Sequence, residues 1–344
     1  MTAAAAAEAG AVRAAAALPE VVFLGSGAFG LPVLRMLADA GRVAAVVSQP
    51  DREAGRGKRP TPTPVSEFAL ARGLPLLRPA DCNAPAELDA IRAAAAGAAA
   101  RAAAGGHPPP GPAFVVIAFG QKLSPALLSG VFAVNLHGSL LPRWRGAAPV
   151  QRALMEGDAV AGVTVIGLAD RMDAGAVYGT GSLAVGPRQT AGELHDALAE
   201  LGPELVGGVL RAWTSGTAAS RAQDEALATR ARKLSRLDAW VDLSMPAGRV
   251  RARINGLNPW PGCSISVDGA PLVVRRCEEP PEAVARPGAP APGTLGADGT
   301  LACGSGAVRL LEVQAPGARA MPFADWARGR RFAGGTATSE PPQA

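Results

Sequence analysis

The chain has 344 residues, of which 48% are hydrophobic, and a formal net charge of +5. This length suits two domains better than one, and the apolar fraction is enough for a sizeable core. No apolar run is long enough to span a bilayer, so we expect no membrane partner. The four cysteines lack Cys-x-x-Cys spacing, which argues against structural zinc and against a disulfide framework.

The charge is unevenly distributed along the chain. Residues 1–210 hold equal numbers of acidic and basic side chains, so the whole basic excess lies in residues 211–344. This asymmetry favours chemistry in the first part and contact with a polyanion in the second. The alternative is that five charges are ordinary scatter.

Residues 1–19 are mostly alanine, lack a secretory core, and are predicted to be a disordered extension.

A glycine-rich turn follows the first predicted strand. Val21–Leu24 then predicts a buried strand, and Gly25–Gly30 has the Gly-x-Gly-x-x-Gly spacing of dinucleotide sites. Such sites need an acid at the end of the second strand, here Val43–Ser48. The nearest acid, Asp51, lies beyond a proline, so a nicotinamide-dependent oxidoreductase stays open as an alternative.

Two low-complexity stretches interrupt this first region. Gln49–Pro64 is predicted to be a polar loop. Its residues alone favour a solvated surface loop, but the basic residues beside glycines would also suit phosphate contacts by a segment that orders on binding. Residues 93–112 are alanine, glycine and proline in most positions. We interpret them as a flexible surface insertion before the buried strand Phe114–Ala118.

The stretch Phe132–Ala148 carries the strongest chemical signal. Asn135 and His137 are two residues apart, so on a strand they share one face. An amide donor and an imidazole side by side can stabilise an oxyanion and move a proton. A loop from Gly138 to Pro142 follows, and polar groups between a strand and a helix lie where open α/β sheets bind ligands.

The rest of the chain predicts a second, β-rich domain. Thr190 and Glu193 form a capping box for the helix through Ala199. Thr214–Asp224 is a small-residue linker, and the short strand-like segments beyond it have the spacing of a small barrel. Arg249 and Arg253 share one face of a predicted helix. They are either solvated side chains or contacts for an anion. Residues 332–344 are predicted to be a disordered tail.

The block Asn135–Pro142 resembles the Asn-x-His-x-Ser-Leu-Leu-Pro signature of the folate-dependent formyltransferases. Asp170–Gly175 is similar to the family pattern Asp-x-x-Asp-x-Gly, in which the second acid is the reactive one. The resemblance covers about residues 20–331. It implies an α/β fold, with a doubly wound Rossmann-like catalytic domain over residues 20–213 and, after a linker at 214–224, an OB-like β-barrel over 225–331.

The resemblance also implies a reaction and its residues. The co-substrate would be 10-formyltetrahydrofolate, with no metal, and the catalytic residues would be Asn135, His137 and Asp173. Folate would lie against two loops, made of Phe119, Gly120, Gln121, Leu123, Ser139, Leu140, Leu141 and Pro142.

Within this family, Gln49–Lys58, Arg232–Ser235 and Asn255–Gly262 resemble the members that act on methionyl-tRNA. This implies transfer of the formyl group to the α-amine of initiator methionyl-tRNA by a monomer, in the bacterial cytoplasm or inside a mitochondrion or plastid. The tRNA contacts would be Arg56, Lys58, Arg59, Lys233, Arg249 and Arg253. Two further alternatives stay open, which are a formyltransferase or formyl-folate hydrolase with another acceptor, and an RNA-binding protein with a degenerate catalytic domain.

Overall fold

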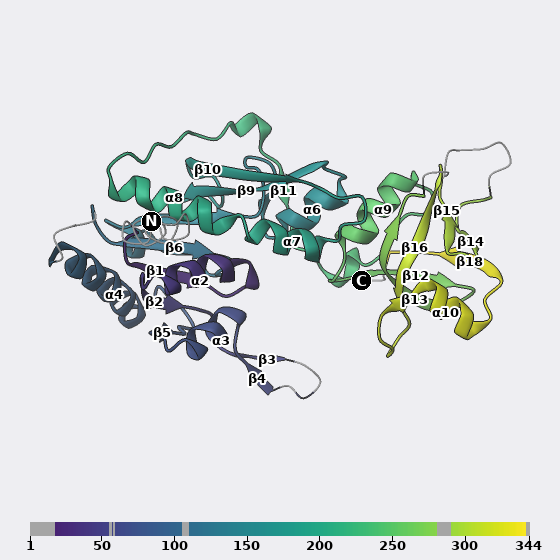
Figure 1. The fold of residues 1–344 in the computed structure, drawn as a ribbon, viewed down its shortest axis with the longest axis horizontal. Coiled ribbons are helices and arrows are strands. Elements are labelled where there is room, and N and C mark those ends of the chain that lie inside the picture. Colours follow the sequence, from purple (N-terminus) through teal and green to yellow (C-terminus); the bar gives the residue numbers. More distant parts are fainter. Residues whose placement is uncertain (1–17, 55–56, 58, 105–109, 281–289, 342–344) are drawn as a thin grey trace, which may run out of the picture. The chain divides into compact units, whose positions relative to one another are not determined.

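The computed structural model describes residues 18–54, 57, 59–104, 110–280 and 290–341. These residues form two compact units, each assembled from segments that are separate along the chain (Figure 1). The first unit contains the chain up to Pro142, together with Gly162–Ser182 and Ala197–Ala228. The second contains Arg143–Ala161, Leu183–Asp196 and the chain from Thr229 onward. No helix within the described ranges combines the length and apolarity needed to cross a membrane.

The first unit is built on a seven-stranded sheet with the order β10-β9-β7-β6-β1-β2-β5. The pairings from β7 to β5 are parallel, and β9 runs antiparallel to β7. Every residue of β1 and β6 is buried, as expected for parallel strands covered on both faces. The strands are β1 (Val21–Gly25), β2 (Val43–Val47), β5 (Leu76–Leu77), β6 (Ala113–Ile117), β7 (Phe132–His137), β9 (Val160–Gly167) and β10 (Val177–Ala184). The predicted Rossmann-like α/β class is confirmed.

Helices pack against this sheet. α4 contacts β1 and β2, and α2 contacts α8 (Figure 1). A Cβ on Gly202, the first residue of α8, would lie 2.7 Å from side-chain atoms of Leu136 and Val33, so a glycine allows α8 to pack this closely. The helices of the first unit are η1 (Ala28–Gly30), α2 (Leu31–Asp39), α3 (Pro64–Ala71), α4 (Pro85–Ala104), α5 (Pro125–Leu128), α8 (Gly202–Thr214) and η2 (Glu225–Leu227). α7 (Ala191–Ala199) begins in the second unit and ends in the first.

The prediction of a flexible insertion over residues 93–112 was wrong for most of its length. Residues 93–104 continue α4, and Ala95 and Ala98 are buried. Alanine has the highest helix propensity, so a run that looks like low complexity can be a regular helix. Residues 105–109 lie outside the described residues. A disordered extension was also predicted for residues 1–19. Its last two residues, Leu18 and Pro19, are buried, so the prediction is wrong for them.

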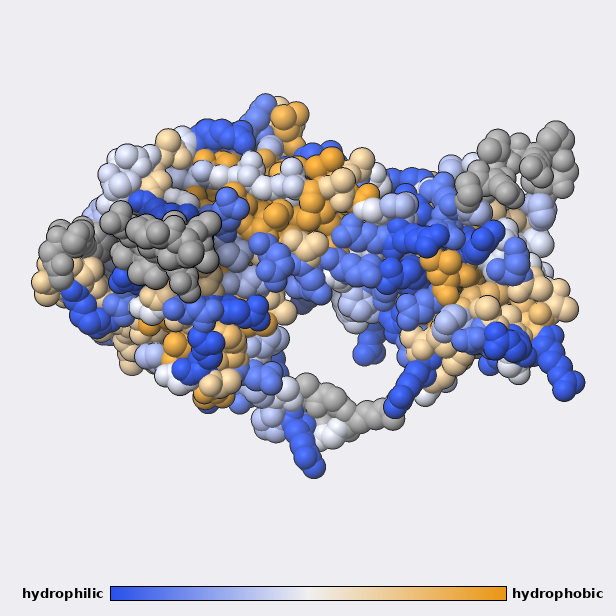
Figure 2. Space-filling view, in the orientation of Figure 1, coloured by the Kyte–Doolittle hydropathy of each residue, from blue (hydrophilic) through white to orange (hydrophobic). Residues whose placement is uncertain are grey.

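The polar segment after β2 forms a β-hairpin. Strands β3 (Arg52–Ala54) and β4 (Arg59–Thr61) pair antiparallel, with Arg52 opposite Thr61. Every residue of β4 is exposed, and Figure 2 shows hydrophilic surface at this hairpin. Arg56 and Lys58, two of the predicted tRNA contacts, lie outside the described residues.

The second unit contains a small closed barrel, which confirms the predicted OB-like β-barrel. Its sheet has the order β13-β12-β18-β14-β15-β16-β17, and an additional pairing of β13 with β16 closes the barrel. Its elements are β8 (Arg145–Gly146), α6 (Pro149–Met155), β11 (Arg230–Ala231), η3 (Arg236–Asp238), α9 (Ala247–Gly256), β12 (Cys263–Val267), β13 (Ala270–Glu278), β14 (Thr294–Gly296), β15 (Thr300–Ala302), β16 (Ala307–Gln314), β17 (Met321–Pro322), α10 (Phe323–Arg330) and β18 (Gly334–Thr338).

The C-terminal tail corrects another prediction. Residues 332–344 were expected to be disordered, but β18 pairs with both β12 and β14. Ala337 of β18 is buried. The sequence of this strand, Gly-Gly-Thr-Ala-Thr, has no large apolar residue that would predict it. It is held by backbone hydrogen bonds to its two neighbours, which need no particular side chain.

The second unit also recruits segments from earlier in the chain. α6 packs against α9, and a Cβ on Gly256 would lie 2.5 Å from Met155 Cγ. Ala148 and Met155 belong to the same hydrophobic core as the barrel strands. This core therefore contains residues that precede β9 of the first sheet in the sequence.

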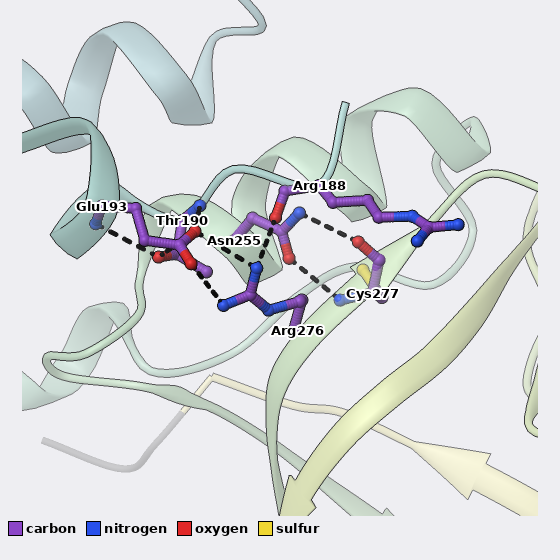
Figure 3. A network of polar contacts seen from close by, with 6 residues as sticks. All are labelled: Arg188, Thr190, Glu193, Asn255, Arg276 and Cys277. Carbon is purple, nitrogen blue, oxygen red and sulfur yellow. Dashed lines mark hydrogen bonds and ion pairs between the residues drawn. The ribbon is translucent and has the colours of Figure 1, made fainter. Parts of the chain in front are cut away.

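A polar network joins residues 188–193 to the barrel (Figure 3). The guanidinium of Arg276 on β13 donates to Glu193 Oε1 at 2.6 Å, to Glu193 Oε2 at 3.2 Å and to the Arg188 carbonyl at 3.4 Å. Glu193 Oε2 also accepts from the Thr190 amide at 3.0 Å, and the Glu193 amide donates to Thr190 Oγ1, so the predicted capping box is confirmed. Nearby, the fully buried Asn255 side chain exchanges two hydrogen bonds with the backbone of Cys277.

Candidate active site

The candidate site begins at the carboxyl end of β7. Asn135 pairs with Val116 on β6 and with Ile166 on β9, and His137 lies opposite Thr164 on β9. Residues two apart on a strand point to the same face, so the amide and the imidazole are on one side of the sheet. The His137 side chain is 7% exposed, and Asn135 is partly buried.

A carboxylate from a different segment lies beside this imidazole. Asp173 follows β9, and its Oδ1 atom is 3.6 Å from His137 Nδ1. The Asp173 side chain is 13% exposed. The distance is too long for a hydrogen bond, but catalytic contacts are often long before substrate binds. An imidazole and a carboxylate at this separation can exchange a proton after a small movement.

The backbone around Asp173 is held in a specific shape. Asp173 has φ +56°, in the left-handed region that few non-glycine residues adopt. A Cβ on Gly175 would lie 1.7 Å from the Gly167 carbonyl oxygen, so only glycine fits there. The Gln223 amide nitrogen donates to the carbonyls of Asp173 and Gly175, at 2.8 Å each. The sequence analysis missed Gln223, because it lies in a linker of small and polar residues.

The loop after His137 is anchored by a buried hydroxyl that the sequence analysis also missed. Thr164 is fully buried, donates to the Ser139 carbonyl at 2.7 Å and accepts from the Leu141 amide at 3.1 Å. Ser139 and Leu141 are buried, whereas Leu140 and Pro142 are partly exposed. Leu140 packs closely over Gly162, where a Cβ would lie 2.5 Å from its Cδ2 atom. If the pairing of β7 with β9 had been known, the position of Thr164 opposite His137 would have indicated its anchoring role.

The second predicted folate loop presents backbone more than side chains. Phe119 and Leu123 are buried in a hydrophobic core of the first unit. The Gln121 amide is used within the protein, donating to the Pro79 carbonyl at 3.1 Å and accepting from the Cys82 amide at 2.7 Å. Gly120 is exposed and has φ +85°. The Phe119 carbonyl accepts hydrogen bonds from Ser26 and Gln49, which fixes the loop against the glycine-rich turn.

Comparison with known proteins identifies the family. Residues 20–210 match the family model described as formyl transferase, and residues 233–331 match the formyl transferase C-terminal domain. The chain belongs to the formyl transferase family. The methionyl-tRNA formyltransferase of Methylobacterium sp. (strain 4-46) is 39% identical over 92% of this chain and 98% of its own length. That of Methylococcus capsulatus is 37% identical over 91% of this chain and 98% of its own.

A solved structure shares the fold. HypX from Aquifex aeolicus, determined in complex with tetrahydrofolic acid, covers 89% of this chain with a TM-score of 0.55 and 15% sequence identity. This formyl transferase spans only 46% of that longer chain. At this identity the likeness concerns the fold alone.

The glycine-rich turn of this formyl transferase is explained by packing. The amides of Ser26 and Gly27 both donate to the Ala118 carbonyl, at 3.2 and 3.3 Å, so these two donors already have a partner within the protein. A Cβ on Gly25 would lie 2.6 Å from the Phe23 ring and 2.8 Å from the Ile117 carbonyl oxygen. Asp51, the candidate ribose-binding acid, pairs with Arg78 at 2.8 Å. These contacts remove the main support for a nicotinamide-dependent oxidoreductase.

The cysteines of this formyl transferase are unsuited to nucleophilic chemistry. All four are buried and unpaired. Burial raises the pKa of the Cys263 thiol to about 12 and the pKa of the Cys82 thiol to about 11, so both remain protonated at neutral pH. Within the described ranges, no group of three or more His, Cys, Asp or Glu side chains is placed to hold a metal ion.

The predicted tRNA contacts fall into two kinds. Arg59 and Lys233 are exposed. Arg249 donates to the Glu156 carbonyl at 2.9 Å and pairs with the Glu156 carboxylate at 2.8 Å. Arg253 is partly buried, donates to the carbonyls of Asp238 and Trp240, and lies over the Trp240 ring. The arginines of α9 therefore make contacts inside the second unit, which the spacing of the sequence alone does not reveal.

Proposed function

We propose that this formyl transferase moves the formyl group of 10-formyltetrahydrofolate to the α-amine of methionine on initiator tRNA. The observation that carries the proposal is the approach of Asp173 to His137 at the end of β7, at 3.6 Å. It occurs in a chain whose methionyl-tRNA formyltransferase relatives match over nearly their whole length. The same fold without these side chains would support binding but not transfer.

The first chemical step needs an unprotonated amine. A free α-amino group has a pKa of about 7.7–8, so a good part of it is protonated at neutral pH. The ammonium form therefore loses one proton to solvent before it reacts. The free amine nitrogen forms a bond to the formyl carbon, and the formyl oxygen becomes an oxyanion. The proton that the attacking nitrogen must now lose passes to the Asp173 carboxylate, directly or through the imidazole of His137.

The second step breaks the bond between the formyl carbon and N10 of the folate. The Asn135 amide and a protonated His137 donate hydrogen bonds to the oxyanion, which lowers the barrier. When the oxyanion collapses, N10 leaves with the bonding electrons and accepts the proton that the His137–Asp173 pair took from the amine. The balance is one formamide and one tetrahydrofolate, with no net change in the protein.

We place the folate against the loops Phe119–Leu123 and Ser139–Pro142. Ser26 and Gln49 donate to the Phe119 carbonyl, and Thr164 holds the Ser139 carbonyl and the Leu141 amide, so these loops have a fixed backbone before a ligand arrives. Gly120 supports this placement, because its exposed backbone has no side chain between it and a ligand.

We propose residues 20–213 as the catalytic part and residues 225–331 as the tRNA-binding part. The exposed Arg59 and Lys233, and the adjoining Arg56 and Lys58, would contact phosphates. Arg249 and Arg253 would hold the tRNA-binding surface in shape, because both donate hydrogen bonds to backbone carbonyls of the second unit. We also propose that the protein acts as a monomer, because one chain supplies every catalytic group, and that it works in the bacterial cytoplasm, since the compared relatives are bacterial.

The decisive experiment offers the full chain rival acceptors. Formyl transfer from 10-formyltetrahydrofolate is measured with charged initiator methionyl-tRNA, with glycinamide ribonucleotide and with water, while NAD(P)H is monitored in parallel. We expect transfer to the tRNA alone. Transfer to the small amine or to water instead would overturn the acceptor and leave the candidate active site standing.

A further inference from the structure

The segment Arg221–Glu225, called the strap below, lies along the loop that carries the catalytic aspartate. It belongs to the sequence between the two family matches, which end at residue 210 and begin again at 233. From sequence it looked like an interdomain linker. In the structure it is part of the first unit, as is the loop Arg171–Val177.

The strap holds this loop at its start, its middle and its end. Arg221 and Val177 form an antiparallel bridge through two backbone hydrogen bonds of 2.8 and 2.9 Å. The Gln223 amide spans the middle of the loop. The carboxylate of Glu225 pairs with Arg171 at 3.1 Å, although both of these side chains are largely exposed and the pair adds little stability.

The contact of Gln223 bears directly on the catalytic geometry. One amide nitrogen has two hydrogens, and here it donates to two carbonyls, those of Asp173 and Gly175. The Asp173 backbone is in the left-handed region, which is unfavourable for a residue with a side chain. A fixed Asp173 carbonyl also fixes the direction in which its side chain leaves the backbone, and therefore the position of the carboxylate relative to His137.

We infer that Gln223 is a positioning residue, which clamps the left-handed Asp173 backbone so that its carboxylate faces His137. The inference deepens the proposed function and rests on it, since it assumes that Asp173 is the reactive carboxylate. The strap thus makes part of the region between the two family domains a component of the active site. Formyl transfer is expected to depend on an amide donor at position 223.

The test uses two substitutions at this position and one matched control. Gln223→Met keeps the length of the side chain but removes both donors. Gln223→Glu keeps the shape but turns a carboxylate oxygen toward two carbonyl oxygens. The control is Gln189→Met, since the Gln189 side chain closes a local turn with the Gly186 amide in the second unit. We expect Gln223→Met to lower kcat about 10- to 100-fold, with KM for folate and tRNA changed less than threefold, and the control to keep both.

Two further measurements separate positioning from general destabilisation. Hydrogen exchange of the amides in residues 171–177 should accelerate in Gln223→Met, while exchange in the strands of the sheet stays unchanged. The Gln223→Glu variant should recover activity relative to the native protein as pH falls. The two carbonyls raise the pKa of the new carboxyl group, and its protonation restores one donor.

The outcomes are distinguishable. If Gln223→Met transfers formyl at the native rate with native exchange at residues 171–177, the clamp is refuted. The clamp is also refuted if the activity of Gln223→Glu, relative to the native protein, does not rise at low pH. If the native protein formylates no tRNA but the exchange at residues 171–177 still responds to Gln223→Met, the proposed function fails and the clamp of the loop remains.

Discussion

At the scale of single residues, the candidate site depends on two side chains of one strand and on a carboxylate that the fold brings beside them. Asn135 and His137 come from one strand, and Asp173 comes from a loop beyond the neighbouring strand, 3.6 Å from the imidazole. The supporting residues Thr164 and Gln223 contact the backbone of the two loops that flank the site. The loops that flank the candidate catalytic side chains are thus held by polar groups from other segments of the chain.

Removing the reactive groups should abolish most of the rate while leaving the fold intact. We expect His137→Ala and Asp173→Asn each to lower kcat by about 1,000-fold or more, because each removes a proton-transfer group. Asn135→Ala should lower kcat about 100- to 1,000-fold, the usual loss for one oxyanion donor. Single-turnover formyl transfer to methionyl-tRNA measures the effect.

The matched control for the imidazole is His195→Ala, since His195 is a partly exposed residue of α7 that pairs with Asp196. It should keep the native rate. A native rate in Asp173→Asn would contradict the mechanism, because no carboxylate would then be needed to accept the proton of the amine.

At the scale of elements, the structure contains a buried amide that joins a helix to the barrel. Asn255 on α9 is fully buried and exchanges hydrogen bonds of 2.9 and 3.0 Å with the Cys277 carbonyl and amide on β13 (Figure 3). Asn255→Ala should lower the free energy of unfolding by about 2–4 kcal/mol, because it leaves a buried donor and a buried acceptor without partners. Urea unfolding followed by tryptophan fluorescence measures this loss.

The comparison variant is Asn255→Asp, which can still accept from the Cys277 amide but cannot donate to the carbonyl when ionised. Its destabilisation should become smaller as pH falls and the carboxyl group regains a proton. An Asn255→Ala protein as stable as the native one would mean that the two backbone groups find other partners.

The contact of Glu193 with Arg276 should give part of the stability a pH dependence. Burial alone would raise the pKa of Glu193, but hydrogen bonds from Arg276 and Thr190 outweigh it, so the pKa lies below its usual value. A lowered folded-state pKa adds stability above the unfolded pKa, about 4.3, and this stability is lost as pH falls through the folded value. The stability difference between native protein and Arg276→Gln should therefore be present at pH 7 and shrink below about pH 4, as urea titrations at both pH values can measure. An equal difference at both pH values would refute the linkage.

Elements with a strong local pattern could be predicted from the sequence. The apolar runs of β1 and β6, the strand carrying Asn135 and His137, and the Thr190–Glu193 capping box all follow from local spacing. The elements that were missed lack such a pattern. β18 is made of small and polar residues and is held by backbone pairing, and the end of α4 looked like a disordered repeat. Gln223 and Thr164 could not be found, because their importance lies in carbonyls that come near them only in the folded chain.

At the scale of the whole molecule, binding of tRNA should be dominated by charge. The basic excess lies in residues 211–344, and polyanion binding releases counterions, so KM for methionyl-tRNA should rise steeply with salt while KM for the folate changes little. Lys233→Gln should weaken tRNA binding and reduce the slope of log affinity against log salt by about 1. The measurement is a series of KM values over increasing KCl.

The control is Arg328→Gln on α10, where an exposed arginine pairs with Asp325 three residues away. It should leave the slope unchanged if the proposed phosphate contacts are the relevant ones. Equal slopes for the native protein and Lys233→Gln would remove Lys233 from the proposed interface.

The position of α6 limits how this protein can be cut or recombined. Met155 of α6 belongs to the barrel core and packs against Gly256, although the helix is encoded between β7 and β9 of the first sheet. A fragment that ends at residue 210 would carry α6 without the core that covers it. A chimaera that takes its barrel from a relative would set foreign side chains against the native Ala148 and Met155. The unit to exchange is therefore discontinuous, and it must include residues 143–161 and 183–196 along with everything from residue 229 onward.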